Sequence, residues 1–232
     1  MEYADNSYLY VFATYEEFLG VFPETAASVS PREITCKVIS LFESSHRESF
    51  ACVAGVGLVD FSAGLAGILA TCKAVQRHVS AVVNLGICGA YPESGIKIGD
   101  IVNVVSENVG DQGFQEQDGS FVPWSNREPY TCLKVPEDSV SIVKSFPYSK
   151  NLPSVRGLSV NCCTGTAETA ETRFKTFGSA VESMEGAALF SICNAFGIPA
   201  IEIRAVSNIA STRDKSQWKI KEALENLRQL FA

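Results

Sequence analysis

Histidine and closely spaced cysteines are what this sequence has least of. Its 232 residues include only two histidines, His46 and His78, and none of its eight cysteines forms a CxxC pair. A structural zinc site needs ligands at short, recurring spacings, so we expect no metal site. Most of the cysteines lie in apolar runs, where a reduced thiol packs as a small hydrophobic group. We therefore expect a reducing, cytoplasmic environment.

Positive charge is also scarce and scattered along the chain. There are 19 Lys and Arg residues against 26 Asp and Glu, which gives a net charge of −7. Because nucleic-acid binding leaves a clustered basic footprint, nucleic acid is not an expected partner. The N-terminus "MEYADNSYLY" carries acids where an export signal has positive charge, so no signal peptide is expected.

Long uninterrupted apolar segments are missing as well. The most apolar region, residues 50–72, is broken by Asp60 and by several glycines. A strand, a glycine turn and a buried helix explain this region better than a membrane segment, so we expect no association with a membrane.

Strand-like and helical patterns alternate along the chain, which is typical of an α/β fold. The composition is 46% hydrophobic with 14 Phe, enough to cover both faces of a central sheet. We predict a single domain over residues 1–232, with a mostly parallel, mixed and twisted central sheet flanked by helices. Residues 111–129 are predicted to form a long loop. The predicted strands are 7–13, 34–42, 50–56, 81–87, 99–106, 155–162 and 199–207, and the predicted helices are 61–77, 138–145, 167–177, 184–196 and 216–231.

Unusual residues gather where the predicted strands end. In a sheet of this kind ligands bind beyond the carboxyl ends of the strands. The segments there are "ATYEEF", "GVG", "NLGICGAY" and "AVSN". Gly55 and Gly57 could begin a dinucleotide-binding motif, but Asp60 stands where the third glycine belongs. A tight turn or a close approach of the backbone to a ligand explains these glycines better.

In "ESMEGAALF", Glu185 stands at the start of a strongly apolar helix, beside Met184. A glutamate at this position is stabilised by the helix dipole whatever else it does, so helix capping is one explanation. Capping does not explain the neighbouring thioether. A carboxylate that accepts from two vicinal hydroxyls, with a methionine packed under the ring, would suit a ribose.

The last predicted strand, "IEIRAVSN", carries a guanidinium and an amide among β-branched residues. Alternation along the strand places Arg204, Val206 and Asn208 on one face. Taken alone, the segment could hold an ion pair from Arg204 to Glu202 or Glu185, followed by an asparagine turn.

Taken together, "ATYEE", "NLGICGAY", "ESMEGAA" and "IRAVSN" resemble the nucleoside phosphorylase and nucleosidase family, whose members cleave the N-glycosidic bonds of nucleosides. The resemblance runs from the first strand to the last helix. Within the family it is strongest to the futalosine hydrolases, through "NLGICGAY" and "SNIASTRDKSQW". Those enzymes release hypoxanthine from futalosine in menaquinone biosynthesis.

The resemblance implies roles for individual residues. Glu17 matches the carboxylate that deprotonates the attacking water, with Glu16 as the neighbouring alternative. Glu185 matches the residue that holds the ribose hydroxyls, Met184 the residue beneath the sugar, and Arg204 a basic residue near the water. The resemblance also implies substrate binding by Gly86, Ile87, Thr164 and Gly165.

Asn208 departs from part of the family, since adenosine-type nucleosidases carry a catalytic Asp at the matching position. An amide NH2 donates to the O6 and N7 acceptors of a 6-oxopurine, so Asn208 favours hypoxanthine or guanine over adenine. A mismatched buried pair would cost about 1 to 3 kcal/mol, which is roughly a ten- to hundredfold difference in selectivity.

A second departure concerns phosphate. Bacterial purine phosphorylases carry Arg and Ser where this chain has Asn84 and Ile87, so water is the expected nucleophile. Arg32, Arg47 or Arg127 could still restore a phosphate site from a neighbouring subunit.

The sequence therefore predicts hydrolysis of a 6-oxopurine nucleoside, with futalosine as the favoured substrate. No metal or organic cofactor is required for this reaction. The resemblance implies a homodimer or larger homo-oligomer. The alternatives are a purine nucleoside phosphorylase, a methylthioadenosine/S-adenosylhomocysteine nucleosidase, and a binding protein that has kept the fold without catalysis.

Overall fold

The computed structural model describes residues 7–31, 38–42, 48–124, 128–132, 142–143 and 146–231. Most of the helix predicted over 138–145 and the first part of the strand predicted over 34–42 lie outside the described residues, as do Arg32, Arg47 and Arg127.

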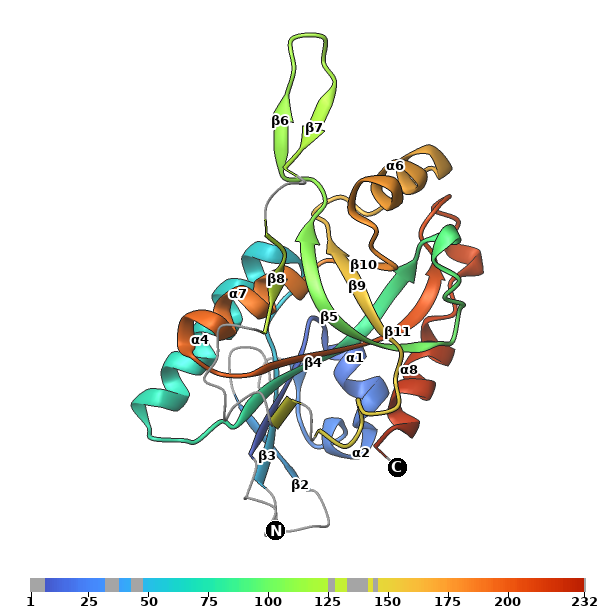
Figure 1. Cartoon of the computed structure of the whole chain (residues 1–232). Coiled ribbons are helices and arrows are strands. Elements are labelled where there is room, and N and C mark those ends of the chain that lie inside the picture. The colour runs from blue at the N-terminus through green and yellow to red at the C-terminus, as the bar shows by residue number, and fades with distance from the viewer. Residues whose placement is uncertain are drawn as a thin grey trace.

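A nine-stranded mixed sheet forms the centre of the molecule (Figure 1). Its main path runs in the order β10-β9-β5-β11-β4-β1-β3-β2, and β8 pairs with β5. Parallel pairings join β1 to β3 and β4, β11 to β4, β5 to β9, and β9 to β10. The other four pairings are antiparallel, so the predicted α/β fold with a mixed, mostly parallel sheet is confirmed. The strands are β1 (Tyr8–Phe12), β2 (Ile39–Phe42), β3 (Glu48–Val53), β4 (Ala81–Ala90), β5 (Ile101–Val109), β8 (Tyr130–Thr131), β9 (Ser154–Ser159), β10 (Val181–Ser183) and β11 (Ala200–Ile209).

Strand β10 was not predicted, because its three residues are too few for a periodic pattern. It pairs with β9 on one side and with the far end of β4 on the other. These pairings close β4, β11, β5, β9 and β10 into a ring. Side chains from four of these strands, including Cys88, Val104, Val181 and Val206, pack against one another in one buried cluster.

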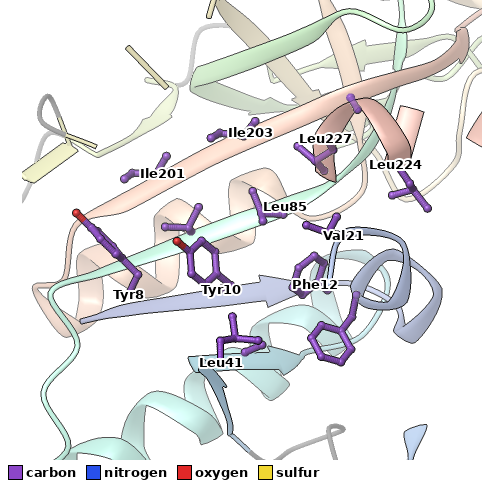
Figure 2. Close-up of a cluster of buried hydrophobic side chains, with 14 of the residues drawn as sticks. Tyr8, Tyr10, Phe12, Val21, Leu41, Leu85, Ile201, Ile203, Leu224 and Leu227 are labelled. Carbon is purple, nitrogen blue, oxygen red and sulfur yellow. The ribbon is translucent and has the colours of Figure 1, made fainter. Parts of the chain in front are cut away.

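Helices cover both faces of the open part of the sheet. Helices α4 (Gly57–Ala74) and α7 (Gly186–Phe196) pack together on one face over a core that includes Val11 and Val82. On the other face, α1 (Tyr15–Val21) and α8 (Ile220–Gln229) cover a second core, which Figure 2 shows around Tyr10 and Leu85. Two further α-helices lie within the described residues, α2 (Pro23–Ala26) and α6 (Ala167–Phe177), and α6 has the bounds that the sequence predicted.

The loop predicted over 111–129 is wrong in part, because the region holds a projecting hairpin of β6 (Gly113–Gln115) and β7 (Phe121–Pro123) (Figure 1). Its turn contains Asp118 and Gly119, and Gly119 adopts a φ of +86°. An Asp-Gly pair is a frequent hairpin signal, so the sequence did contain the cue.

Helix α4 is long and apolar enough to cross a membrane by length and composition. That finding is weak evidence for a membrane segment, because the core helix of a soluble protein meets the same criterion. The buried side of α4, which includes Phe61, Leu65 and Leu69, belongs to the core that it shares with α7.

Candidate active site

A cavity of about 200 Å³ opens where β1, β4, β9 and β11 end, the edge at which the sequence predicted a ligand site. Residues from each of these strand ends, from β10 and from the start of α4 face it. Its lining is Ala13, Thr14, Glu17, Val56, Ile87, Cys88, Gly89, Val160, Cys163, Thr164, Glu182, Ser183, Met184, Glu185, Ser207, Asn208 and Trp218.

Glu17 is held in this cavity by a capping box at the start of α1. The Thr14 hydroxyl accepts from the Glu17 N–H, and the Thr14 N–H donates to Glu17 Oε2 at 3.1 Å. The Ile87 N–H donates to Glu17 Oε1 at 3.0 Å. Glu17 is only 7% exposed, whereas Glu16 is exposed, so the structure brings Glu17 and not Glu16 to the cavity.

Burial raises the pKa of Glu17 above the ordinary glutamate value. The positive charge of Arg204 opposes this shift, and the carboxylate of Glu185 adds to it. A raised pKa makes the carboxylate a stronger base, which suits the removal of a proton from water near neutral pH.

The raised pKa of Glu17 predicts how kcat/KM depends on pH on the acid side of the profile. If ionised Glu17 is the base, kcat/KM falls as the pH drops through the raised pKa, at a higher pH than an ordinary glutamate pKa of 4.5 would give. Initial rates measured from pH 4 to 8 in a buffer of constant ionic strength test this. A loss centred at or below 4.5 would contradict it.

Glu185 is the N-cap residue of α7, but its side chain makes no capping hydrogen bond to that helix. Instead its Oε1 accepts from the Gly57 N–H at 3.1 Å, and its Oε2 accepts from Arg204 Nη2 at 3.3 Å. Gly57 has a φ of +83°, which favours glycine at this turn. Met184 lines the cavity beside Glu185, as expected.

Arg204 lies behind the cavity and is 1% exposed. Its Nε donates to Glu202 Oε1 at 2.8 Å and its Nη2 to Glu185 Oε2, so both ion pairs considered from the sequence are present. Burial alone would lower the pKa of Arg204, but the carboxylates of Glu202, Glu185 and Glu17 outweigh it and raise that pKa. Arg204 is therefore a permanent cation between acidic side chains.

Gly86 does not line the cavity but lies directly beneath the charged groups. A Cβ at this position would be 2.6 Å from both Arg204 Nη1 and Glu17 Oε1. The absence of a side chain therefore lets the guanidinium and the carboxylate approach one another.

Gly86→Ala is expected to separate Glu17 from Arg204. Overpacking should lower the free energy of unfolding by about 1 to 3 kcal/mol and reduce kcat about tenfold or more. Chemical denaturation and steady-state kinetics measure both effects. Gly67→Ala is the matched control, because among the described residues no atom outside the adjoining helix backbone lies within 4 Å of a Cβ there. Equal behaviour of the two variants would contradict this role for Gly86.

Asn208 reaches the cavity for a reason that simple alternation did not give. The register of β11 against β4 shifts between Val206 and Asn208, so Val206 packs in the core while Ser207 and Asn208 both line the cavity. Asn208 Oδ1 accepts from the Ser207 hydroxyl at 2.8 Å. Its Nδ2 donates to the Ile209 carbonyl at 3.2 Å and lies beside Gly89, 3.1 Å from where a Cβ would be, so its second N–H is left for a ligand in this part of the cavity.

Comparison with known proteins places these features in a family. The family model described as "Phosphorylase superfamily" matches residues 38–232. The chain belongs to the phosphorylase superfamily. The family resemblance found in the sequence is thereby confirmed.

This superfamily member is similar to curated futalosine hydrolases. It is 32% identical to that of Thermus thermophilus over 183 residues, which cover 75% of each chain. It is 33% identical to that of Acidothermus cellulolyticus over 184 residues, which cover 78% of this chain and 72% of the relative.

Solved structures share the fold of this superfamily member. A futalosine hydrolase mutant from Helicobacter pylori superposes with a TM-score of 0.70 at 16% identity, covering 97% of this chain and 96% of the other. A methylthioadenosine/S-adenosylhomocysteine nucleosidase from Colwellia psychrerythraea, in complex with adenine, superposes with a TM-score of 0.65 at 21% identity. The superposition covers 100% of this chain and 95% of the other.

The site of this superfamily member also contains a carboxylate that sequence analysis missed. Glu182 accepts from the Thr164 N–H at 2.9 Å and from the Tyr91 hydroxyl at 2.8 Å. Arg173 Nη1 lies 3.3 Å from the same carboxylate. The network holds Thr164 at the cavity wall, whereas Gly165 is exposed and outside the lining. The sequence signal for Glu182 was only a charged residue in a three-residue strand.

Proposed function

We propose that this chain hydrolyses the N-glycosidic bond of a 6-oxopurine nucleoside and that futalosine is its substrate. The observation that carries the proposal is that Glu17, Glu185 and Asn208 line one cavity. These three side chains can serve the water, the sugar and the base respectively. Futalosine hydrolases at 32 and 33% identity support the choice of substrate.

Binding of the sugar is assigned to Glu185 and Met184. Each Glu185 oxygen accepts one hydrogen bond from the protein, from Gly57 or from Arg204, and keeps a lone pair for a ribose hydroxyl. As the glycosidic bond breaks, positive charge develops on the ribosyl ring. A fixed carboxylate stabilises that cation more than the neutral ground state, which is what accelerates the reaction.

Activation of the attacking water is assigned to Glu17. With Oε1 and Oε2 held by backbone N–H groups of Ile87 and Thr14, the carboxylate has a fixed position at the cavity wall. It accepts the proton of a water molecule as that water attacks the anomeric carbon. Arg204 lies behind Glu17 and Glu185: its charge opposes the rise that burial causes in the pKa of Glu17, and its Nη2 forms an ion pair with Glu185.

Binding of the purine base is assigned to Asn208. Its Oδ1 accepts from Ser207 and one N–H of its NH2 donates to the Ile209 carbonyl, so the second N–H is the group that can donate to N7 or O6 of a keto purine. This hydrogen bond stabilises the negative charge that the leaving hypoxanthine acquires. An amide is a weaker acid than a carboxylic acid, so Asn208 stabilises the leaving base by a hydrogen bond and does not transfer a proton to it.

A phosphorylase reaction fits the cavity less well. None of the described residues that line it is basic, and Glu17, Glu182 and Glu185 are acidic. A phosphate dianion would meet carboxylates instead of the arginine fork that normally binds it. Water is therefore the proposed nucleophile.

A substrate panel tests the proposal. Base release is measured from futalosine, inosine and methylthioadenosine, each with and without inorganic phosphate. We expect hypoxanthine from futalosine at a rate that phosphate does not change, with at least tenfold slower release of adenine from methylthioadenosine. Turnover of inosine only in the presence of phosphate would show phosphorolysis and contradict the proposed hydrolysis. Preferential release of adenine would contradict the proposed specificity for 6-oxopurines.

The further expectations from the sequence are part of the same proposal. We infer one nucleosidase domain over residues 1–232, a cytoplasmic location, no metal or organic cofactor, and a homodimer or larger homo-oligomer. The seven described cysteines are all free thiols, as a reducing compartment would leave them.

A further inference from the structure

Two carboxyl groups that the proposed mechanism does not use lie behind the active site. Glu107 of β5 and Glu202 of β11 are 1% and 0% exposed, and neither lines the cavity. Glu202 connects them to the site, because its Oε1 accepts from Arg204 Nε at 2.8 Å. Arg204 in turn donates to Glu185.

The other oxygen of each group faces the same small space. Among the described residues, neither Glu107 Oε1 nor Glu202 Oε2 has a hydrogen-bond partner. A Cβ at Gly186 would lie 2.5 Å from both of these oxygens, and a Cβ at Gly157 would lie closer still to Glu107 Oε1. Two glycines therefore make room for the two carboxyl groups at the start of α7.

The charges in this region do not balance if every acid is ionised. Glu17, Glu185, Glu202 and Glu107 surround one buried cation, Arg204. A buried carboxylate without a cation is costly, and two carboxyl groups that face each other relieve this cost by retaining one proton between them.

We propose that Glu107 and Glu202 share one proton, carried by Glu107, and that this hydrogen bond fixes Glu202 so that it orients Arg204 toward the active site. Glu107 is then a positioning residue for the reaction. It donates from Oε1 to Glu202 Oε2, which supplies each oxygen with the partner that it lacks.

The surroundings favour Glu107 as the acid. Burial raises the pKa of Glu107 well above the ordinary value, and the charge of Glu202 raises it further. The Ser159 hydroxyl, which donates to Glu107 Oε2 at 2.9 Å, and the charge of Arg204 oppose the shift. Burial also raises the pKa of Glu202, but the charge of Arg204 and its direct hydrogen bond to Glu202 offset part of that rise.

The other polar groups of the packed elements do not supply a second positive charge. Strand β4 contributes Asn84, the register partner of Glu202, and the Cys88 thiol. Helix α7 is preceded by Glu185 and contributes the Ala187 N–H, which donates to Ser159 Oγ at 2.8 Å. Arg204 is thus the one cation that acts on the pair among the described residues.

Infrared spectroscopy tests the proton without any substrate. At neutral pH the unliganded enzyme should show the C=O band of a protonated carboxyl group, and this band should be missing from Glu107→Gln in a difference spectrum. If Glu107→Gln leaves the protonated-carboxyl region unchanged, the proposal is wrong. Because no turnover is involved, this result stands even if the proposed reaction fails.

Kinetics tests the positioning role and rests on the proposed function. Glu107→Gln retains a donor toward Glu202, so kcat should stay within about threefold of wild type. Glu107→Ala removes the donor and should lower kcat about tenfold or more, with little change in KM. Equal losses in the two variants would show that Glu107 acts as an anion and would overturn the proposal.

The alkaline side of the pH profile gives a third readout. In wild type, kcat should fall when the pair loses its proton, because two ionised carboxylates repel and displace Glu202 from Arg204. Glu107→Gln should lack this decrease. A wild-type rate that instead depends on the concentration of Na⁺ or K⁺ at fixed ionic strength would show that a cation, and not a proton, joins the pair.

Discussion

Glu17→Gln is expected to lower kcat by about three orders of magnitude, the range attributed to a general base. Glutamine has nearly the same shape, but its amide cannot take a proton from water. Its Oε1 can still accept from the Ile87 N–H, so the side chain should remain at the cavity wall. The affinity for hypoxanthine, measured by calorimetry, should change only a few-fold, because Glu17 is assigned to the water and not to the base.

Glu16→Gln is the matched control for this variant. Glu16 is the adjacent residue in the same turn of α1 and is exposed, so its variant should keep the wild-type kcat. A large loss in Glu16→Gln with activity kept in Glu17→Gln would reverse the assignment. A protein without turnover in any form would fit the binding-protein alternative instead.

Asn208→Asp is expected to shift the preference of the enzyme toward 6-aminopurines. A protonated Asp can donate to N7 and accept from the amino group of adenine, whereas the amide of Asn208 donates to a keto purine. The ratio of kcat/KM for inosine to that for adenosine, which differ only in the base, should fall about ten- to hundredfold. Initial rates of base release for the two nucleosides measure it.

Asn208→Ala separates recognition from simple damage to the site. Without a donor or acceptor, this variant should lose activity on inosine and gain none on adenosine. If Asn208→Asp and Asn208→Ala change the rates on inosine and adenosine in parallel, Asn208 does not determine which purine is preferred. The assignment of purine binding to Asn208 is then wrong.

Local sequence signals predicted the parts of the site that depend on short segments. Glu17 was assigned through the family resemblance carried by "ATYEE"; the Thr14 to Glu17 spacing of a capping box in the same segment was not used, although the structure shows that box holding Glu17. The segments around Glu185 and Asn208 were found because polar residues interrupt apolar patterns at strand ends, and the cavity contains both. The alternation of elements was also sufficient for the α/β class.

The parts that the sequence did not reveal depend on contacts between distant segments. The ring of strands closes through β10, whose residues 181–182 pair with residues 89–90 of β4. Strand β10 has only three residues, which are too few to show a periodic pattern in the sequence. Glu107 and Glu202 face each other across two strands nearly a hundred positions apart, so no local pattern linked the two carboxyl groups. The register shift in β11 likewise depends on its pairing with β4, and no rule of alternation could give it.

The central claim is that a keto purine binds against Asn208, and a crystal structure with hypoxanthine bound tests it most directly. The account predicts N7 or O6 of hypoxanthine within hydrogen-bond distance of Asn208 Nδ2, beside Gly89, with the sugar position above Met184 left open toward Glu185. Hypoxanthine bound elsewhere in the cavity, or with only its carbon edge toward Asn208, would contradict it.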